Sequence, residues 1–174
     1  LLMLDDLLPQ AGVEKVSVRV KLEVPAGWKV FTTAHMTQSG EYEFADIEKA
    51  SVLIGRNLRE RTVTSDGCVI RLLTSGDWQF SDDEAAKMVV EIMGGYKKTF
   101  GSSASQSTQI AIFKFPSDVP LGNWEADTRG GSVTIASSDM PFRSQSLQRL
   151  HEQLRHEIFH LWIPNGVNLS GRYD

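Results

Sequence analysis

The chain of 174 residues has a net charge of −4 without any basic block or stripe, which argues against nucleic acid as a partner. No apolar run approaches the length of a membrane span, and the opening residues lack the positive region and cleavage site of a signal peptide. The apolar share of 41% and the charged share of 23% fit a globular protein of one domain or two small ones.

The first half of the chain has the pattern of β-structure. Residues 16–24 alternate apolar and polar side chains, as in a strand with one buried face. Turn residues follow at 25–27, so residues 28–33 are predicted to form the partner strand. Three further strands are predicted, at residues 51–54, 59–64 and 68–73. A hairpin turn at 65–67 joins the last two, and together these strands predict a β-rich N-terminal module over residues 1–76.

The pattern changes after residue 77. Ser81 and the acids that follow it are typical of a helix start, and residues 85–98 are predicted to be helical. Strands are predicted at residues 108–115 and 132–137. The fold class expected for the whole chain is therefore α+β, with a second domain over residues 77–174.

Ser144 is predicted to cap a long final helix. Its apolar stripe consists of residues at helical spacing: Leu147, Leu150, Leu154, Ile158 and Leu161. The turn signal that begins at Pro164 is predicted to end this helix.

This helix carries the sequence His156-Glu157-Ile158-Phe159-His160. Two histidines four residues apart project from nearly the same helix face, so that they can share one metal ion, and Zn²⁺ is the cofactor that this spacing predicts. Glu157 lies beside the metal and can act as the general base that takes a proton from a metal-activated water. The sequence thus predicts a zinc metallopeptidase with His156 and His160 as ligands.

A peptidase site needs a third protein ligand and an open position for water. Asp174 is the one acidic residue after His160, and we expect the third ligand to be a glutamate that follows residue 174 in a longer protein. His151 points away from the face of the two histidines and is expected to be an ordinary helix residue.

Other interpretations of the motif stay open. The spacing can arise by coincidence on a surface helix, or it can persist in a zincin fold that no longer turns over substrate and only binds peptides. A zincin that hydrolyses something other than peptides is a further alternative.

The segment from Leu154 to Trp162 resembles the zinc helix of the glycyl aminopeptidase family of gluzincin metallopeptidases. The turn Pro25-Ala26-Gly27-Trp28 is similar to a turn in the β-domain of that family, and Gly130-Gly131 is similar to the glycine pair that leads into its substrate-binding edge strand. The resemblance covers most of the chain.

The resemblance implies a β-rich N-terminal domain and the first part of a thermolysin-like (zincin) catalytic domain that ends just after the zinc helix. It implies that Gly130, Gly131, Ser132, Val133 and Thr134 bind the backbone of a peptide or protein substrate at an edge strand. It further implies a C-terminal continuation with the third zinc ligand and in some members a PDZ domain, and it favours a bacterial periplasmic or secreted location.

The chain departs from the family at two points. Members with aminopeptidase activity have an acidic residue soon after the glycine pair, whereas Ser132-Val133-Thr134-Ile135 follows here. The glutamate ligand of the family and its oxyanion-stabilising side chain have no counterpart within the 174 residues.

Overall fold

The computed structural model describes residues 1–7, 17–115 and 119–163. The chain divides into two compact units, residues 1–58 and residues 59–174. Mixed sheets and a few helices make the fold α+β, as expected. None of the helices in the described ranges is long and apolar enough to cross a membrane.

The first unit contains two three-stranded antiparallel sheets, with the strand orders β1-β6-β3 and β2-β5-β4. The strands are β1 (Leu2–Met3), β2 (Val18–Val20), β3 (Lys29–Phe31), β4 (His35–Met36), β5 (Tyr42–Phe44) and β6 (Ser51–Gly55). Two short helices, α1 (Leu4–Leu7) and η1 (Ile47–Lys49), accompany them. The core of this unit consists of Leu4, Phe44, Ala50 and Val52 with partly buried neighbours.

The pairing expected in this unit is wrong. Residues 16–24 and 28–33 were expected to form one hairpin, but β2 pairs with β5 and β3 pairs with β6. Apolar alternation shows which face of a strand is buried, but it does not select the partner strand, which depends on the tertiary fold.

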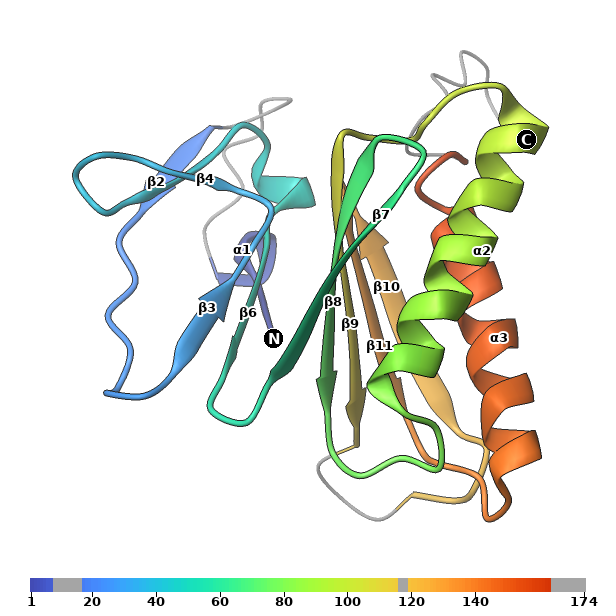
Figure 1. Cartoon of the computed structure of the whole chain (residues 1–174). Helices are drawn as coiled ribbons and strands as arrows, with labels where there is room; N and C mark the ends of the chain where they lie inside the picture. Colours follow the sequence, from blue (N-terminus) through green and yellow to red (C-terminus); the bar gives the residue numbers. More distant parts are fainter. Residues whose placement is uncertain (8–16, 116–118, 164–174) are drawn as a thin grey trace, which may run out of the picture. The chain divides into compact units, whose positions relative to one another are not determined.

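The second unit is a five-stranded sheet of order β10-β11-β9-β8-β7, covered on one face by α2 and α3 (Figure 1). The strands are β7 (Arg59–Ser65), β8 (Cys68–Ser75), β9 (Ser107–Lys114), β10 (Trp124–Arg129) and β11 (Ser132–Ser137). The helices are α2 (Asp82–Phe100) and α3 (Arg143–Phe159). The three inner strands β8, β9 and β11 are parallel, and the two outer strands are antiparallel to their neighbours.

The unit boundary lies between Leu58 and Arg59 rather than near residue 76. The strands β7 and β8 look from the sequence like a continuation of the first module, but β8 pairs with β9 from Val69 to Ser75. The hairpin of β7 and β8 has the expected turn: Asp66 and Gly67 both have positive φ, as a two-residue loop with the twist of antiparallel strands requires.

The core of the second unit lies between the sheet and the two helices. It contains Ile70 and Leu72 of β8, Ile110 and Ile112 of β9, Val133 and Ile135 of β11, Val89 of α2, and Leu150, Leu154 and Ile158 of α3. The stripe predicted for α3 is therefore the side that anchors the helix to the sheet, and the opposite side remains available for chemistry.

Candidate metal centre

The two histidines of the predicted zinc motif lie at the C-terminal end of α3, on the side away from the buried stripe. The side chain of His156 is largely exposed, and that of His160 is half-buried. Their Nε2 atoms are 3.3 Å apart. The helix thus brings two imidazole nitrogens together from positions one turn apart.

This separation fits one zinc ion between the two rings. A tetrahedral zinc with Zn–N bonds of about 2.0–2.1 Å holds two ligand nitrogens roughly 3.3 Å apart. In the metal-free protein the same distance allows one ring to donate a hydrogen bond to the other. The donor set of two imidazoles, with a carboxylate next to them, is the chemistry that zinc prefers.

The ring of His160 is held by a second contact. Its Nδ1 lies 3.0 Å from the main-chain oxygen of Ile163. Because a carbonyl oxygen can only accept, Nδ1 carries the proton, and Nε2 presents its lone pair toward His156. A backbone carbonyl on the outer nitrogen is the partner that zinc-binding histidines commonly have.

Glu157 is brought to the same place, and it is buried although its neighbour His156 is exposed. Glu157 is 5% exposed, and its Oε1 lies 3.8 Å from Nε2 of His156. Its other oxygen, Oε2, accepts a hydrogen bond of 2.8 Å from the hydroxyl of Thr128 in β10. Ligand atoms of His156, Glu157 and His160 all lie within 4.8 Å of one another.

β10 contributes a second residue to the centre. The indole of Trp124 meets the ring of His156 edge to face, with centroids 5.8 Å apart. No strand is predicted from the sequence over the residues of β10. The signal is nevertheless present: Trp124, Ala126 and Thr128 alternate with Glu125, Asp127 and Arg129 directly before the glycine pair.

The glycine pair forms the turn between β10 and β11. Gly130 has φ +56°, a conformation in which a side chain is disfavoured, and Arg129 pairs with Ser132 across the turn. Ser132, Val133 and Thr134 follow in β11 and are buried.

The expectation that Ser132–Ser137 is an edge strand is wrong. β11 lies between β9 and β10 and is paired on both sides, so its main chain has no open side for a peptide. Among the described strands, β10 is the last one at this side of the sheet. A role of Gly130, Gly131 and the following residues in substrate binding stays a prediction.

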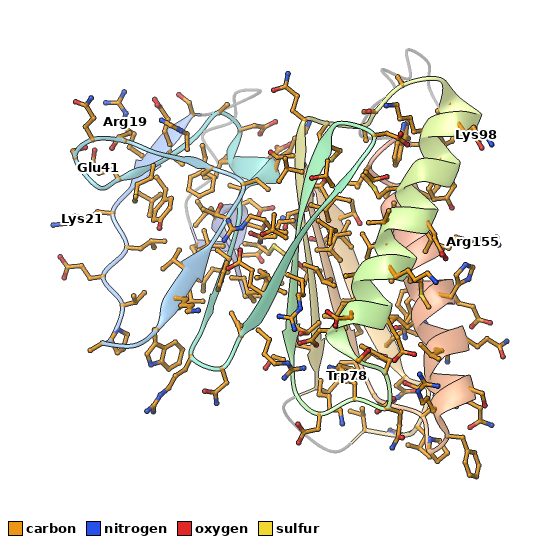
Figure 2. All side chains as sticks on the ribbon, viewed as in Figure 1. Arg19, Lys21, Glu41, Trp78, Lys98 and Arg155 are labelled. Carbon is orange, nitrogen blue, oxygen red and sulfur yellow. The ribbon has the colours of Figure 1, made fainter. Side chains whose placement is uncertain are left out.

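A groove between α2 and α3 borders the metal centre. Its volume is about 510 Å³, and Tyr96, His151, Glu152, Arg155, His156 and Phe159 line it. Arg155 projects on the side of the two helices that faces away from the sheet (Figure 2). His151 is exposed and lines this groove, apart from the histidine pair, as expected for an ordinary helix residue.

Within residues 1–7, 17–115 and 119–163, the side chains of His, Cys, Asp and Glu that lie close enough together to hold a metal ion are those of His156, Glu157 and His160. Asp174, the acidic candidate for a third ligand, lies outside the described residues, as does the turn at Pro164.

Comparison with solved structures places this fold among known proteins. The chain is similar to an aminopeptidase N family protein from Idiomarina loihiensis, with a TM-score of 0.69 and 16% identity over 87% of this chain and 28% of that chain. It also matches an M1 zinc metallopeptidase from Deinococcus radiodurans, with a TM-score of 0.41 and 17% identity over 79% of this chain and 33% of that chain. No protein-family model matches the sequence, and no curated protein matches it. The chain spans about a third or less of these structures, and it shares its fold with part of the aminopeptidase N family protein.

Proposed function

We propose that this chain is part of a zinc-dependent metallopeptidase of the gluzincin type, related to the glycyl aminopeptidases, and that residues 59–174 begin its thermolysin-like catalytic domain. The observation that carries the proposal is the separation of 3.3 Å between two imidazole nitrogens with a buried carboxylate beside them. The similarity to an aminopeptidase N family protein supports it at the level of the fold.

His156 and His160 would hold the ion, and zinc, when bound, would make water more acidic and polarise the scissile carbonyl. Glu157 takes a proton from the attacking water, whose oxygen adds to the carbonyl carbon of the peptide. The same carboxyl then gives the proton to the leaving amine as the C–N bond breaks. Its buried position keeps bulk water away from this proton transfer.

The substrate is a peptide in extended conformation that pairs with residues 124–127 of β10. Among the strands that the structure describes, β10 is at the edge of the sheet, and main-chain pairing at a sheet edge is a general way to bind extended peptides. Trp124 lies both on this strand and against His156, and this contact supports a path for the peptide beside the histidines.

We further propose that a glutamate on a helix after residue 174 of a longer protein supplies the third ligand. The test is the zinc content of the 174-residue chain and of a longer chain that includes that helix, each with a His160→Ala variant. His151→Ala is the matched control, because His151 is an exposed histidine of the same helix.

We expect the longer chain to hold one zinc ion, to lose it in His160→Ala and to keep it in His151→Ala. If neither chain holds zinc, the metallopeptidase proposal fails. A peptide-binding module without catalysis then becomes the better candidate, and the strand β10 at the edge of the sheet favours it.

A further inference from the structure

A single hydroxyl links the last strand of the sheet to the buried carboxylate of α3. The Oγ1 of Thr128 lies 2.8 Å from Oε2 of Glu157 and 3.2 Å from the main-chain oxygen of the same residue. A hydroxyl has one proton to donate, and a charged carboxylate oxygen is a stronger acceptor than a main-chain oxygen. The shorter contact, to Oε2 of Glu157, is therefore the main hydrogen bond of Thr128 with this residue.

The hydrogen bond distinguishes the two carboxylate oxygens of Glu157. With Oε2 held by Thr128, the other oxygen lies 3.8 Å from Nε2 of His156, on the side of the histidine pair. Without the bond, the carboxylate could rotate about its last torsion, which has broad energy minima. A general base works only when its free oxygen is within hydrogen-bond reach of the proton that it accepts.

From this geometry we propose that Thr128 is a positioning residue for Glu157. Its hydroxyl fixes the orientation of the carboxylate and turns Oε1 toward the place where His156 and His160 would hold the metal. The catalytic role of Thr128 rests on the proposed function, but its hydrogen bond to Glu157 can be tested in the metal-free protein.

The backbone of Thr128 is placed by the sheet. Thr128 is opposite Val133 in the β10–β11 pair, two residues from the glycine turn, and Val133 is fully buried in the core. The hydroxyl is therefore presented by a paired strand, which is a more precise support than a loop.

The first experiment uses the metal-free chain and a double-mutant cycle of Thr128→Val and Glu157→Met. Valine keeps the shape of threonine without the hydroxyl, and methionine replaces the acceptor by an apolar group of similar length. We expect Thr128→Val alone to lower the denaturant midpoint, because a buried carboxylate loses its donor, and the double variant to lower it by less than the sum of the two.

Thr74→Val is the matched control. Thr74 is a buried threonine of the same sheet that donates a hydrogen bond of 2.7 Å to a carboxylate, that of Asp82, away from the histidines. Thr74→Val should lower the denaturant midpoint, and its effect should simply add to that of Glu157→Met in the double variant. Additive effects in the Thr128 cycle would overturn the inference.

The second experiment measures peptide hydrolysis by the zinc-loaded longer chain, which includes the helix proposed to supply the third ligand. Thr128→Val should lower kcat by roughly 10- to 100-fold, with little change in KM or zinc content, whereas Thr128→Ser should stay close to the original protein. A loss of zinc, an equal loss in the serine variant, or an unchanged kcat would each contradict a positioning role. If the unmodified protein hydrolyses no peptide, the proposed function fails, while coupling in the metal-free cycle still supports the positioning of Glu157.

Discussion

The two helices on the sheet are stabilised in different ways. α2 has a complete set of local end contacts: Ser81 and Glu84 form a capping box, and Gly101 ends the helix in the left-handed conformation with φ +74°. Phe142, the residue directly before α3, provides no side-chain cap, and the first turn of the helix contains no acidic residue. The sequence of α2 specifies its own ends, whereas α3 depends on its surroundings.

Contacts from other elements hold α3 in place. Gln153 donates a hydrogen bond of 2.8 Å to Ser137 of β11, and Thr128 of β10 bonds to Glu157. The hydroxyl of Tyr96 in α2 donates to the main-chain oxygen of Arg155 over 2.8 Å. The difference between the helices shows where chemistry can be placed: a helix that is fixed by the sheet presents its groups at defined positions relative to the sheet edge.

Replacement of Glu157 tests whether α3 carries the catalytic base, and it should have the largest effect. We expect Glu157→Gln to lower kcat by roughly 10²- to 10⁴-fold, because the amide cannot accept the proton from water. Zinc content should not change, since the proposed function assigns the metal to the imidazoles of His156 and His160 and the proton transfer to Glu157. Steady-state kinetics and elemental analysis check this. Glu152→Gln, an exposed change on the same helix, should leave kcat unaltered, and equal losses in both variants would contradict the role of Glu157.

Truncation of the anchoring stripe tests how far α3 depends on the sheet. Leu154 is fully buried in the core, and Leu154→Ala should lower the free energy of unfolding by about 2–5 kcal/mol. Denaturant unfolding measures this. His151→Ala, on the exposed side of the same helix, should change it by no more than about 0.5 kcal/mol. A small loss in Leu154→Ala would show that α3 is not anchored by its apolar stripe.

The contribution of the start of α2 to stability should depend on pH. The pKa of Asp82 lies below its usual value, chiefly because Arg59 donates a hydrogen bond to its carboxylate; burial opposes this shift, and a hydrogen bond from Thr74 adds to it. A carboxyl with a depressed pKa in the folded state stabilises the protein above its unfolded pKa of about 3.9, and this contribution is lost as the pH falls through the folded value.

Asp82→Asn should therefore lower the free energy of unfolding by about 1–3 kcal/mol at neutral pH. The difference from the original protein should begin to shrink as the pH falls below about 4, where the carboxyl takes up its proton in the unfolded chain, and should vanish once the pH has passed the lower pKa of the folded state. Unfolding curves across the acid range measure it. Asp83→Asn is the control, because the side chain of Asp83 is 81% exposed and its ion pair with Arg61 is solvated.

The smallest effect should come from the helix caps. Ser81→Ala removes the capping hydrogen bond of α2 and should cost about 1 kcal/mol. Ser144→Ala should cost almost nothing, because Ser144 lies inside α3 and does not cap it. Unfolding midpoints of the two variants make the comparison, and equal losses would mean that Ser144 supports α3 in some other way.

Local chemistry explains which elements could be predicted from the sequence. The turn at Asp66-Gly67, the start of α2 at Ser81 and the approach of His156 to His160 all depend on residues close in the chain, and the structure has them as predicted. The cap at Ser144 was wrong, because the helix begins before it and is fixed by tertiary contacts.

What the sequence did not reveal depends on distant partners. The pairing of β2 with β5, the interior position of β11 and the inclusion of β7 and β8 in the second unit are all matters of which strands meet. Thr128 has no motif that would mark it, because its importance comes from a carboxylate 29 residues away in the chain. Neither alternation nor spacing can predict such a contact.

The two-glycine turn has a consequence for the evolution of this sheet edge. Side chains of a strand alternate between its faces, so a shift of β10 by one residue would turn Thr128 away and present Asp127 or Arg129 to Glu157. Asp127 would set two carboxylates against each other, and Arg129 would neutralise the base in an ion pair. An insertion or deletion of one residue at Gly130-Gly131 would therefore change the side chain that faces Glu157 in α3. The proposed catalysis would be lost, although His156, Glu157 and His160 themselves had not changed.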